Sequence, residues 1–153
     1  MNRRNLLRSI LAAFFGWPEE SFAAHAPISV IVNKRCRVSD VDRNELRQIF
    51  QTTKTAWSGT GDRVTALNLP DKHPVRHEFD RVVLGLEPDR VLRYWVDRKI
   101  RGDARPPRTA PNPAAVLRAV AADHDMIGYV PSSDVDKDVK VIARIVDGNL
   151  QGA

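Results

Sequence analysis

A short polar stretch between a predicted strand and a predicted helix has the side chains needed to bind an anion. Pro70 ends an apolar run, and Pro74 suits the first position of a helix because it has no N–H that would be left unpaired there. The free N–H groups and the dipole at a helix start attract anions. We therefore predict a ligand-binding site formed by Asp71, Lys72, His73 and Arg76.

The same stretch allows other interpretations. Exposed basic side chains are the norm on protein surfaces, so its basic residues also fit a solvated, charged helix entry. His73 and His77 are four residues apart and would share a helix face, which could suit a metal with Asp71 or Asp80. Two histidines without a clear third ligand do not define a metal site, so we predict none.

The common catalytic motifs are missing from the sequence. It has no nucleophile elbow, Walker loop, Cys-x-x-Cys pair or zinc-protease helix. Residues 58–61 resemble a phosphate-binding loop but precede a strand, which is typical of a turn. Cys36 is a lone thiol without an identifiable base. We therefore expect a binding protein rather than an enzyme, with no catalytic residue and no cofactor.

Apolar periodicity places the polar stretch within an α/β fold. Buried strands are predicted at residues 28–32, 64–69, 126–130 and 139–146. Helices are predicted to start after Asp42, at Pro74, at Pro88 and at Pro113, with Glu45 completing a capping box for the first. This alternation indicates a sheet with helices on both faces and no second domain.

The bulk properties fit one soluble domain with an anionic partner or simply a solvated basic surface. The chain has 153 residues and a formal net charge of +5. No run of Lys and Arg reaches the length of a nucleic-acid patch, so we predict no nucleic-acid partner.

The first 23 residues have the features of an export signal. Three arginines precede an apolar segment at residues 10–17, and Ser21 and Ala23 fit a small-x-small cleavage site. Arg3 and Arg4 also resemble the pair of a twin-arginine signal. The apolar segment is too short to span a bilayer. We therefore predict a signal peptide at 1–23 and one domain at 24–153 that is periplasmic and not membrane-spanning.

The order of five segments resembles the second lobe of bacterial phosphate-binding proteins. These segments are residues 30–34, 45–50, 54–57, 70–79 and 126–131, and the likeness extends from about residue 28 to 146. Such proteins are the extracytoplasmic substrate-binding subunits of ABC transporters. The resemblance implies a three-layer α/β sandwich, that is, one lobe of the periplasmic-binding-protein type II fold.

The resemblance also implies a ligand and its contacts. Asp71 would accept a hydrogen bond from a protonated oxyanion, while Lys72, His73 and Arg76 would supply donors and positive charge. The family's loop reads Asp-Gly-Ser-Gly-Thr, and only Asp71 carries over, because His73 and Val75 lack the hydroxyls and Pro74 lacks a donor.

Full-length members close two lobes on the ligand, and this chain has the length of one. We expect weak, salt-sensitive binding of inorganic phosphate or a similar oxyanion, unless an ABC permease or a second protein completes the cleft. The alternative is a periplasmic interaction domain that kept the lobe and lost the ligand.

Overall fold

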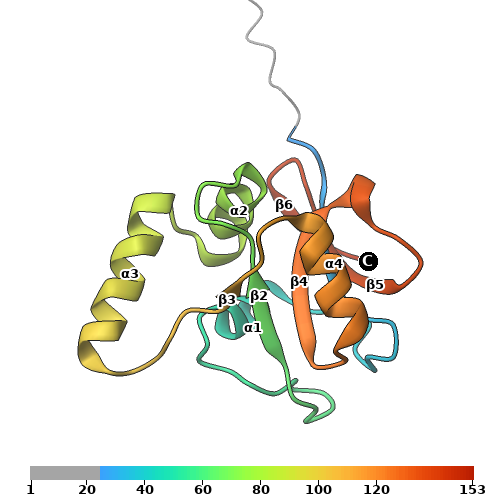
Figure 1. Ribbon diagram of the computed structural model, residues 1–153, viewed down its shortest axis with the longest axis horizontal. Coiled ribbons are helices and arrows are strands. Elements are labelled where there is room, and N and C mark those ends of the chain that lie inside the picture. Colours follow the sequence, from blue (N-terminus) through green and yellow to red (C-terminus); the bar gives the residue numbers. More distant parts are fainter. Residues whose placement is uncertain (1–24) are drawn as a thin grey trace, which may run out of the picture.

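A mixed six-stranded sheet forms the centre of the molecule (Figure 1). The computed structural model describes residues 25–153. The strand order is β3-β2-β4-β1-β5-β6, in which β2 runs parallel to β3 and β4 and the other pairs are antiparallel. The strands are β1 (Ile28–Asn33), β2 (Thr65–Asn68), β3 (Arg108–Thr109), β4 (Met126–Pro131), β5 (Val139–Val146) and β6 (Asn149–Gly152).

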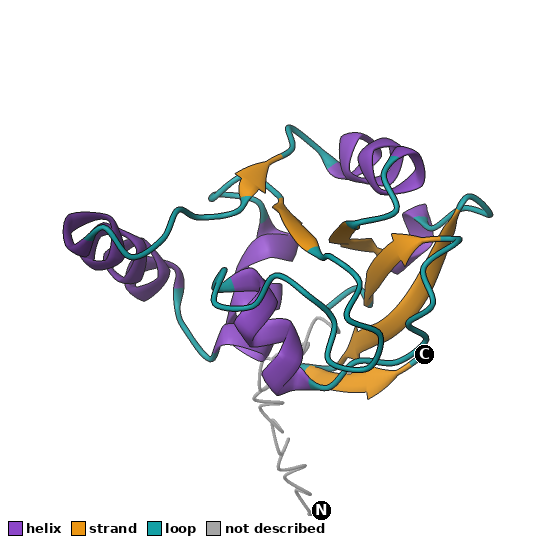
Figure 2. Ribbon diagram, turned by 90° about the horizontal axis from the view of Figure 1, so that it is seen from below, coloured by secondary structure: helices purple, strands orange, loops and turns teal. Residues whose placement is uncertain are grey.

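Helices on both sides of this sheet complete a three-layer α/β sandwich, which confirms the predicted fold class (Figure 2). All four predicted strands and all four predicted helix starts are present. The helices are α1 (Arg43–Phe50), α2 (Pro74–Phe79), the π-helical turn η1 (Asp80–Leu84), α3 (Pro88–Arg101), α4 (Pro113–Ala122) and the 3-10 turn η2 (Ser132–Asp134).

Two neighbouring residues of β4 face the two helical layers. Successive side chains of a strand point to opposite faces of the sheet. A Cβ added at Gly128 would lie 2.5 Å from a methyl carbon of Val116, so α4 packs directly on this glycine. Tyr129 faces the other layer, where its ring stacks on Phe79 of α2 with 3.8 Å between the ring centroids. The centroid of the Phe50 ring in α1 lies 5.6 Å away. This aromatic cluster is the centre of the core on that side.

Local capping explains where two of the helices begin. The Asn112 side chain accepts a hydrogen bond from Ala115 N–H at 2.9 Å, and the Asp42 side chain accepts one from Glu45 N–H at 2.9 Å. The predicted return bond of the capping box is not formed. Glu45 instead accepts from Ser58 N–H at 2.8 Å and pairs with Lys54 at 3.0 Å, so its carboxylate holds the 51–62 link in place.

Three features of the described residues were not predicted. β3 lies in the Pro-rich segment 103–111, where no strand was predicted, and β6 extends the sheet by pairing with β5. The third is the exposure of Leu92 in α3, which is 64%.

The predicted signal peptide, residues 1–23, lies outside the described residues. Within residues 25–153, none of the helices combines the length and the apolar character that crossing a membrane requires.

Candidate functional site

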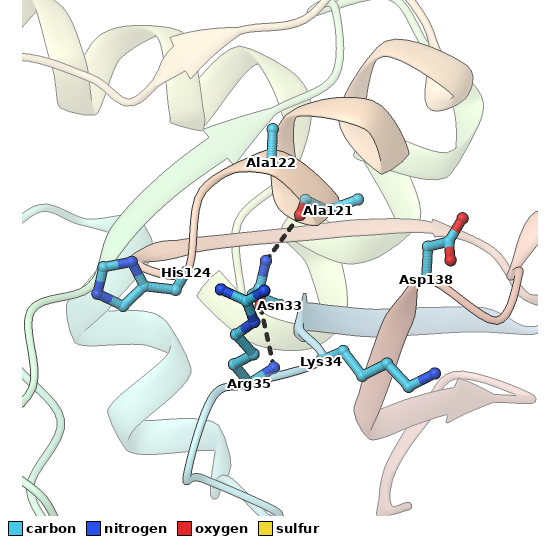
Figure 3. A pocket seen from close by; sticks show the side chains of 7 residues that line it. All are labelled: Asn33, Lys34, Arg35, Ala121, Ala122, His124 and Asp138. Atoms are coloured by element: carbon cyan, nitrogen blue, oxygen red, sulfur yellow. Dashed lines mark hydrogen bonds between the residues drawn. The ribbon is translucent and has the colours of Figure 1, made fainter.

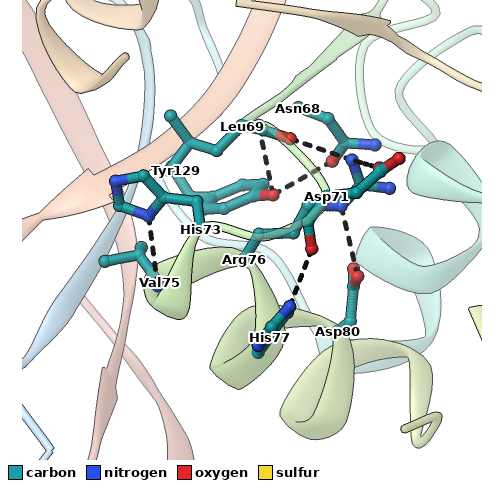
Figure 4. Close-up of polar contacts among 9 residues, drawn as sticks. All are labelled: Asn68, Leu69, Asp71, His73, Val75, Arg76, His77, Asp80 and Tyr129. Atoms are coloured by element: carbon teal, nitrogen blue, oxygen red, sulfur yellow. Dashed lines mark hydrogen bonds and ion pairs between the residues drawn. The ribbon is translucent and has the colours of Figure 1, made fainter. Parts of the chain in front are cut away.

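The side chain of Tyr129 holds the end of β2 by hydrogen bonds (Figure 4). The loop that carries the predicted site follows directly after this end. The Tyr129 hydroxyl donates to Asn68 Oδ1 at 3.1 Å and accepts from Leu69 N–H at 3.4 Å. Burial raises the pKa of Tyr129 well above its ordinary value, so the hydroxyl stays protonated and remains a donor. The loop therefore starts from a rigid, buried anchor.

Arg76 connects this anchor to the candidate site. The residue is only 5% exposed although it is charged. Its Nη1 donates to Leu69 O at 2.9 Å and lies 2.5 Å from Asp71 Oδ1, and its Nε donates to Asp80 Oδ2 at 3.3 Å. A buried guanidinium needs such partners, because leaving it unpaired would cost several kcal/mol. Two carboxylates thus hold the Arg76 side chain in place.

One edge of Arg76 remains open. Among residues 25–153, no hydrogen bond engages Nη2, and no fully buried side-chain nitrogen or oxygen lacks a partner. Nη2 is therefore not fully buried, and Arg76 is one of the residues that line a pocket. Its two N–H groups can donate to an acceptor that enters this pocket.

Asp80 is the buried partner of Arg76, and its side chain is 6% exposed. Burial raises the pKa of Asp80 to about 6, and the neighbouring positive charge of Arg76 only partly opposes this shift. Protonation of Asp80 would leave Arg76 with one fewer negative partner. The hold of the protein on Arg76 is therefore expected to weaken as the pH falls through 6.

The structure brings three of the four predicted residues together. Asp71, Lys72 and Arg76 line one pocket of about 440 Å³, and the Asp71 side chain is 81% exposed. His73 is not among the lining residues, because its Nδ1 accepts a hydrogen bond from Val75 N–H at 3.2 Å and caps α2. That bond also occupies one of the N–H groups expected to face an anion.

The histidine pair considered for a metal has other contacts. His77 Nε2 lies 2.7 Å from the Asp71 carbonyl oxygen, while His73 is the α2 cap. In the described part of the chain, one group of three residues is close enough together to hold a metal ion. It consists of Asp123, His124 and Asp125, which lie in a turn away from this pocket.

The pocket also has an apolar side that sequence reasoning missed. It is formed by α3 and the segment before β3, with Pro88, Val91, Leu92, Trp95, Pro106 and Pro107 among the lining residues. Helical periodicity does expect Val91 and Trp95 to be buried, but it does not show that α3 lies beside the Asp71 loop. Only the tertiary arrangement brings these groups together.

A second pocket, of about 510 Å³, lies at the far end of β1 (Figure 3). Its basic residues include Lys34 and Arg35, and His124 lies on its rim. Lys34 Nζ donates to Lys137 O at 3.0 Å, and the Asn33 amide donates to the carbonyls of Val120 and Ala121 at 2.9 Å. These polar groups serve the fold, so this pocket is the weaker candidate.

Comparison with known proteins identifies the fold. No family model and no curated protein matches the chain. Solved structures do match, and two of them are named as phosphate transport proteins. An ABC-type phosphate transport receptor from Vibrio cholerae matches at 17% identity and a TM-score of 0.59, over 82% of this chain and 52% of that one.

Two further structures give the same result. A protein described as a phosphate ABC transporter substrate-binding protein, with bound phosphate, from Clostridium perfringens is 20% identical, with a TM-score of 0.61 over 82% of this chain and 48% of that one. PstS from Borrelia burgdorferi is 12% identical, with a TM-score of 0.56 over 77% of this chain and 47% of that one. The chain thus spans about half the length of these structures, and the predicted likeness to one lobe is confirmed at the level of the fold.

Proposed function

We propose that this protein binds a phosphate-type oxyanion in the pocket lined by Asp71, Lys72 and Arg76, as the solute-binding component of an ABC uptake system. The observation that carries the proposal is the Arg76 side chain. It is buried and held by Asp71, Asp80 and a backbone carbonyl, it lines the pocket, and within residues 25–153 its Nη2 makes no hydrogen bond. A donor of this kind, beside the acceptor oxygens of Asp71, suits an oxyanion that still bears a proton.

Binding is expected to be weak. Asp71 and Asp80 already neutralise Arg76, and His73 occupies Val75 N–H, so few donors remain for the anion. The exposed side of the site is open to water and salt, which screen its charges. A permease or another protein covering the pocket would strengthen the interaction, since displacing water strengthens electrostatic contacts.

Export to the periplasm belongs to the same proposal. It rests on the features of residues 1–23 and on the fold shared with substrate-binding proteins. Alkaline phosphatase fused after residue 23 would be active only if the segment is exported. Replacing both Arg3 and Arg4 by Lys would distinguish the twin-arginine route from the general one.

Calorimetric titration of the full-length protein with inorganic phosphate and with sulfate tests the binding proposal. We expect saturable heat with phosphate, weaker binding of sulfate, which has no proton to donate to Asp71, and a loss of affinity as salt increases. Lys72→Ala should weaken phosphate binding, whereas Lys99→Ala, which removes an exposed lysine outside the pocket, should not. Salt-independent submicromolar binding by the monomer would contradict the proposed open site.

The second candidate function is a periplasmic interaction domain that kept the lobe and lost its transport ligand. A specific observation favours it, because one face of α3 exposes large apolar side chains. Leu92, Val96 and Ile100 follow one another at spacings of four residues and are 64%, 48% and 79% exposed. Exposed apolar patches are often sites of protein contact. A folded protein that gives no heat with either anion would favour this candidate.

A further inference from the structure

The pocket beside Arg76 is larger and more apolar than a site for inorganic phosphate requires. It measures about 440 Å³, and its walls continue from the ionic end along α3 and the segment before β3. Pockets of this size, with a few polar groups at one end of an apolar surface, typically hold organic ligands. A single tetrahedral oxyanion would leave most of the volume filled with water against apolar side chains.

The ionic end has the groups to hold an oxyanion head of low charge. Arg76 Nη2 supplies donors and the Asp71 carboxylate supplies acceptors. Asp71, Asp80 and Asp89 line the pocket together with Lys72 and Arg76, so with His77 neutral its formal charge is −1. This balance disfavours a bare dianion. A monoanionic head that can also donate a hydrogen bond fits better.

The apolar end provides a surface for the rest of such a ligand. Leu92 is 64% exposed and lines the pocket beside Trp95 and Pro106. Covering exposed apolar surface is favourable in proportion to the area removed from water. An aromatic or aliphatic body next to the oxyanion would therefore add affinity that inorganic phosphate cannot obtain.

We infer that the preferred ligand is an organic oxyanion with an apolar body, such as a phosphate monoester, rather than inorganic phosphate. This inference rests on the proposed function, because it places the oxyanion head at Asp71 and Arg76. It adds α3 as the element that selects the ligand. Leu92 is then a specificity-determining residue, although it lies outside the polar loop.

Calorimetric titration of the full-length protein with phenyl phosphate and with inorganic phosphate tests the inference at pH 6, where about half of a phosphate monoester is still the proton-bearing monoanion. The two ligands share the head and differ in the apolar body. We expect phenyl phosphate to bind about tenfold more tightly, as partial burial of a phenyl ring implies. Leu92→Ala should reduce its affinity about threefold and leave that of inorganic phosphate unchanged.

Ile100→Ala is the matched control. Ile100 lies on the same face of α3, is 79% exposed and does not line the pocket, so its loss should change neither affinity. Equal affinity for the two ligands would overturn the inference and leave the proposed function standing. An equal effect of Leu92→Ala on both ligands would also overturn it. Binding of neither ligand by the folded protein would overturn both proposals.

Discussion

Helices α4 and α3 differ in how firmly the rest of the molecule holds them. The Asn112 side chain caps the first turn of α4, and the Asn33 amide donates to two carbonyls of its last turn. Between these ends, Val116 and Val120 are fully buried, and Val116 packs against Gly128. Both ends of α4 and its sheet-facing side therefore have structural partners.

α3 stands apart from the sheet (Figure 1) and has fewer such attachments. Its N-terminus has no side-chain cap. Val91 and Trp95 are buried, and Arg98 donates to Gln51 O at 3.0 Å, but Leu92 and Ile100 are largely exposed. The contacts of α4 thus stabilise the fold, whereas α3 leaves apolar surface exposed that a ligand or a partner could cover.

Gly128→Ala should have the largest effect, because it forces α4 away from the sheet. The new Cβ would lie 2.5 Å from a methyl group of Val116, whose β-branched side chain has few alternative rotamers. Overpacking of this kind costs about 2 to 3 kcal/mol. Urea denaturation would measure the loss in the free energy of unfolding.

Gly59→Ala is the control for this substitution, because a Cβ at Gly59 would meet nothing within 4 Å. It should leave the unfolding midpoint nearly unchanged. Equal midpoints for the two variants would mean that α4 does not pack on β4 as described.

The second effect concerns how the stability of the protein depends on pH through Asp80, which lines the pocket beside α3. Asp80 has a folded-state pKa of about 6, above the ordinary value of 3.8 expected for the unfolded chain. Between these values the folded state binds more protons, so the contribution of Asp80 to stability is present below pH 3.8 and decreases as the pH rises to 6. Over the whole range the decrease is at most about 3 kcal/mol in the free energy of unfolding.

Asp80→Asn should remove this contribution. As the pH rises from 4 to 7, we expect the wild type to lose stability relative to the variant, because only the wild type has the Asp80 carboxyl. Denaturation curves at several pH values measure the difference, which cancels the titration of other groups. A difference that does not change with pH would show that Arg76 compensates fully for the burial of Asp80.

Asn33→Ala should have a smaller effect, again on α4. The substitution removes both hydrogen bonds to the last turn and leaves the carbonyls of Val120 and Ala121 with one partner fewer. Loss of such a bond costs about 1 kcal/mol. Hydrogen exchange should show faster exchange in the last turn of α4. Unchanged protection there would mean that this end of the helix is held by other contacts.

Ile100→Ser should have the smallest effect on stability, because 79% of the side chain is already exposed. We expect a change within about 0.5 kcal/mol, as for ordinary surface substitutions. Analytical ultracentrifugation of the same variant would show whether the face binds a second copy. A large loss of stability would place this face in the core and remove the contrast with α4.

The fold could be predicted from the sequence wherever the signal is local. The Asn112-Pro113 pair marks the start of α4, and the apolar run before Pro70 marks β2, because capping and burial act over a few residues. β3 is two residues long and depends on pairing with β2, which no local pattern reveals. The hydrogen bond between Glu45 and Ser58 N–H could not be predicted either, because it joins residues 13 positions apart and replaces the local capping-box bond.

The candidate site divides in the same way. Asp71 and Lys72 in the loop and Arg76 in the first turn of α2 are close in the sequence, so their proximity was predictable. Arg76 and Asp80 are four residues apart on consecutive helical turns, so their pairing was also open to local reasoning. The apolar wall from α3 and Pro106 depends on how distant segments pack. Periodicity finds the apolar face of a helix but not whether anything covers it, which is why the exposure of Leu92 was not foreseen.

The most direct test of the account is an amide chemical-shift titration of the full-length, ¹⁵N-labelled protein with inorganic phosphate. We predict saturable shifts at residues 71–77 and at the facing side of α3, with the amides of α4 unmoved. Absence of shifts at 71–77, or shifts confined to the pocket around Lys34 and His124, would contradict the placement of the oxyanion beside Arg76.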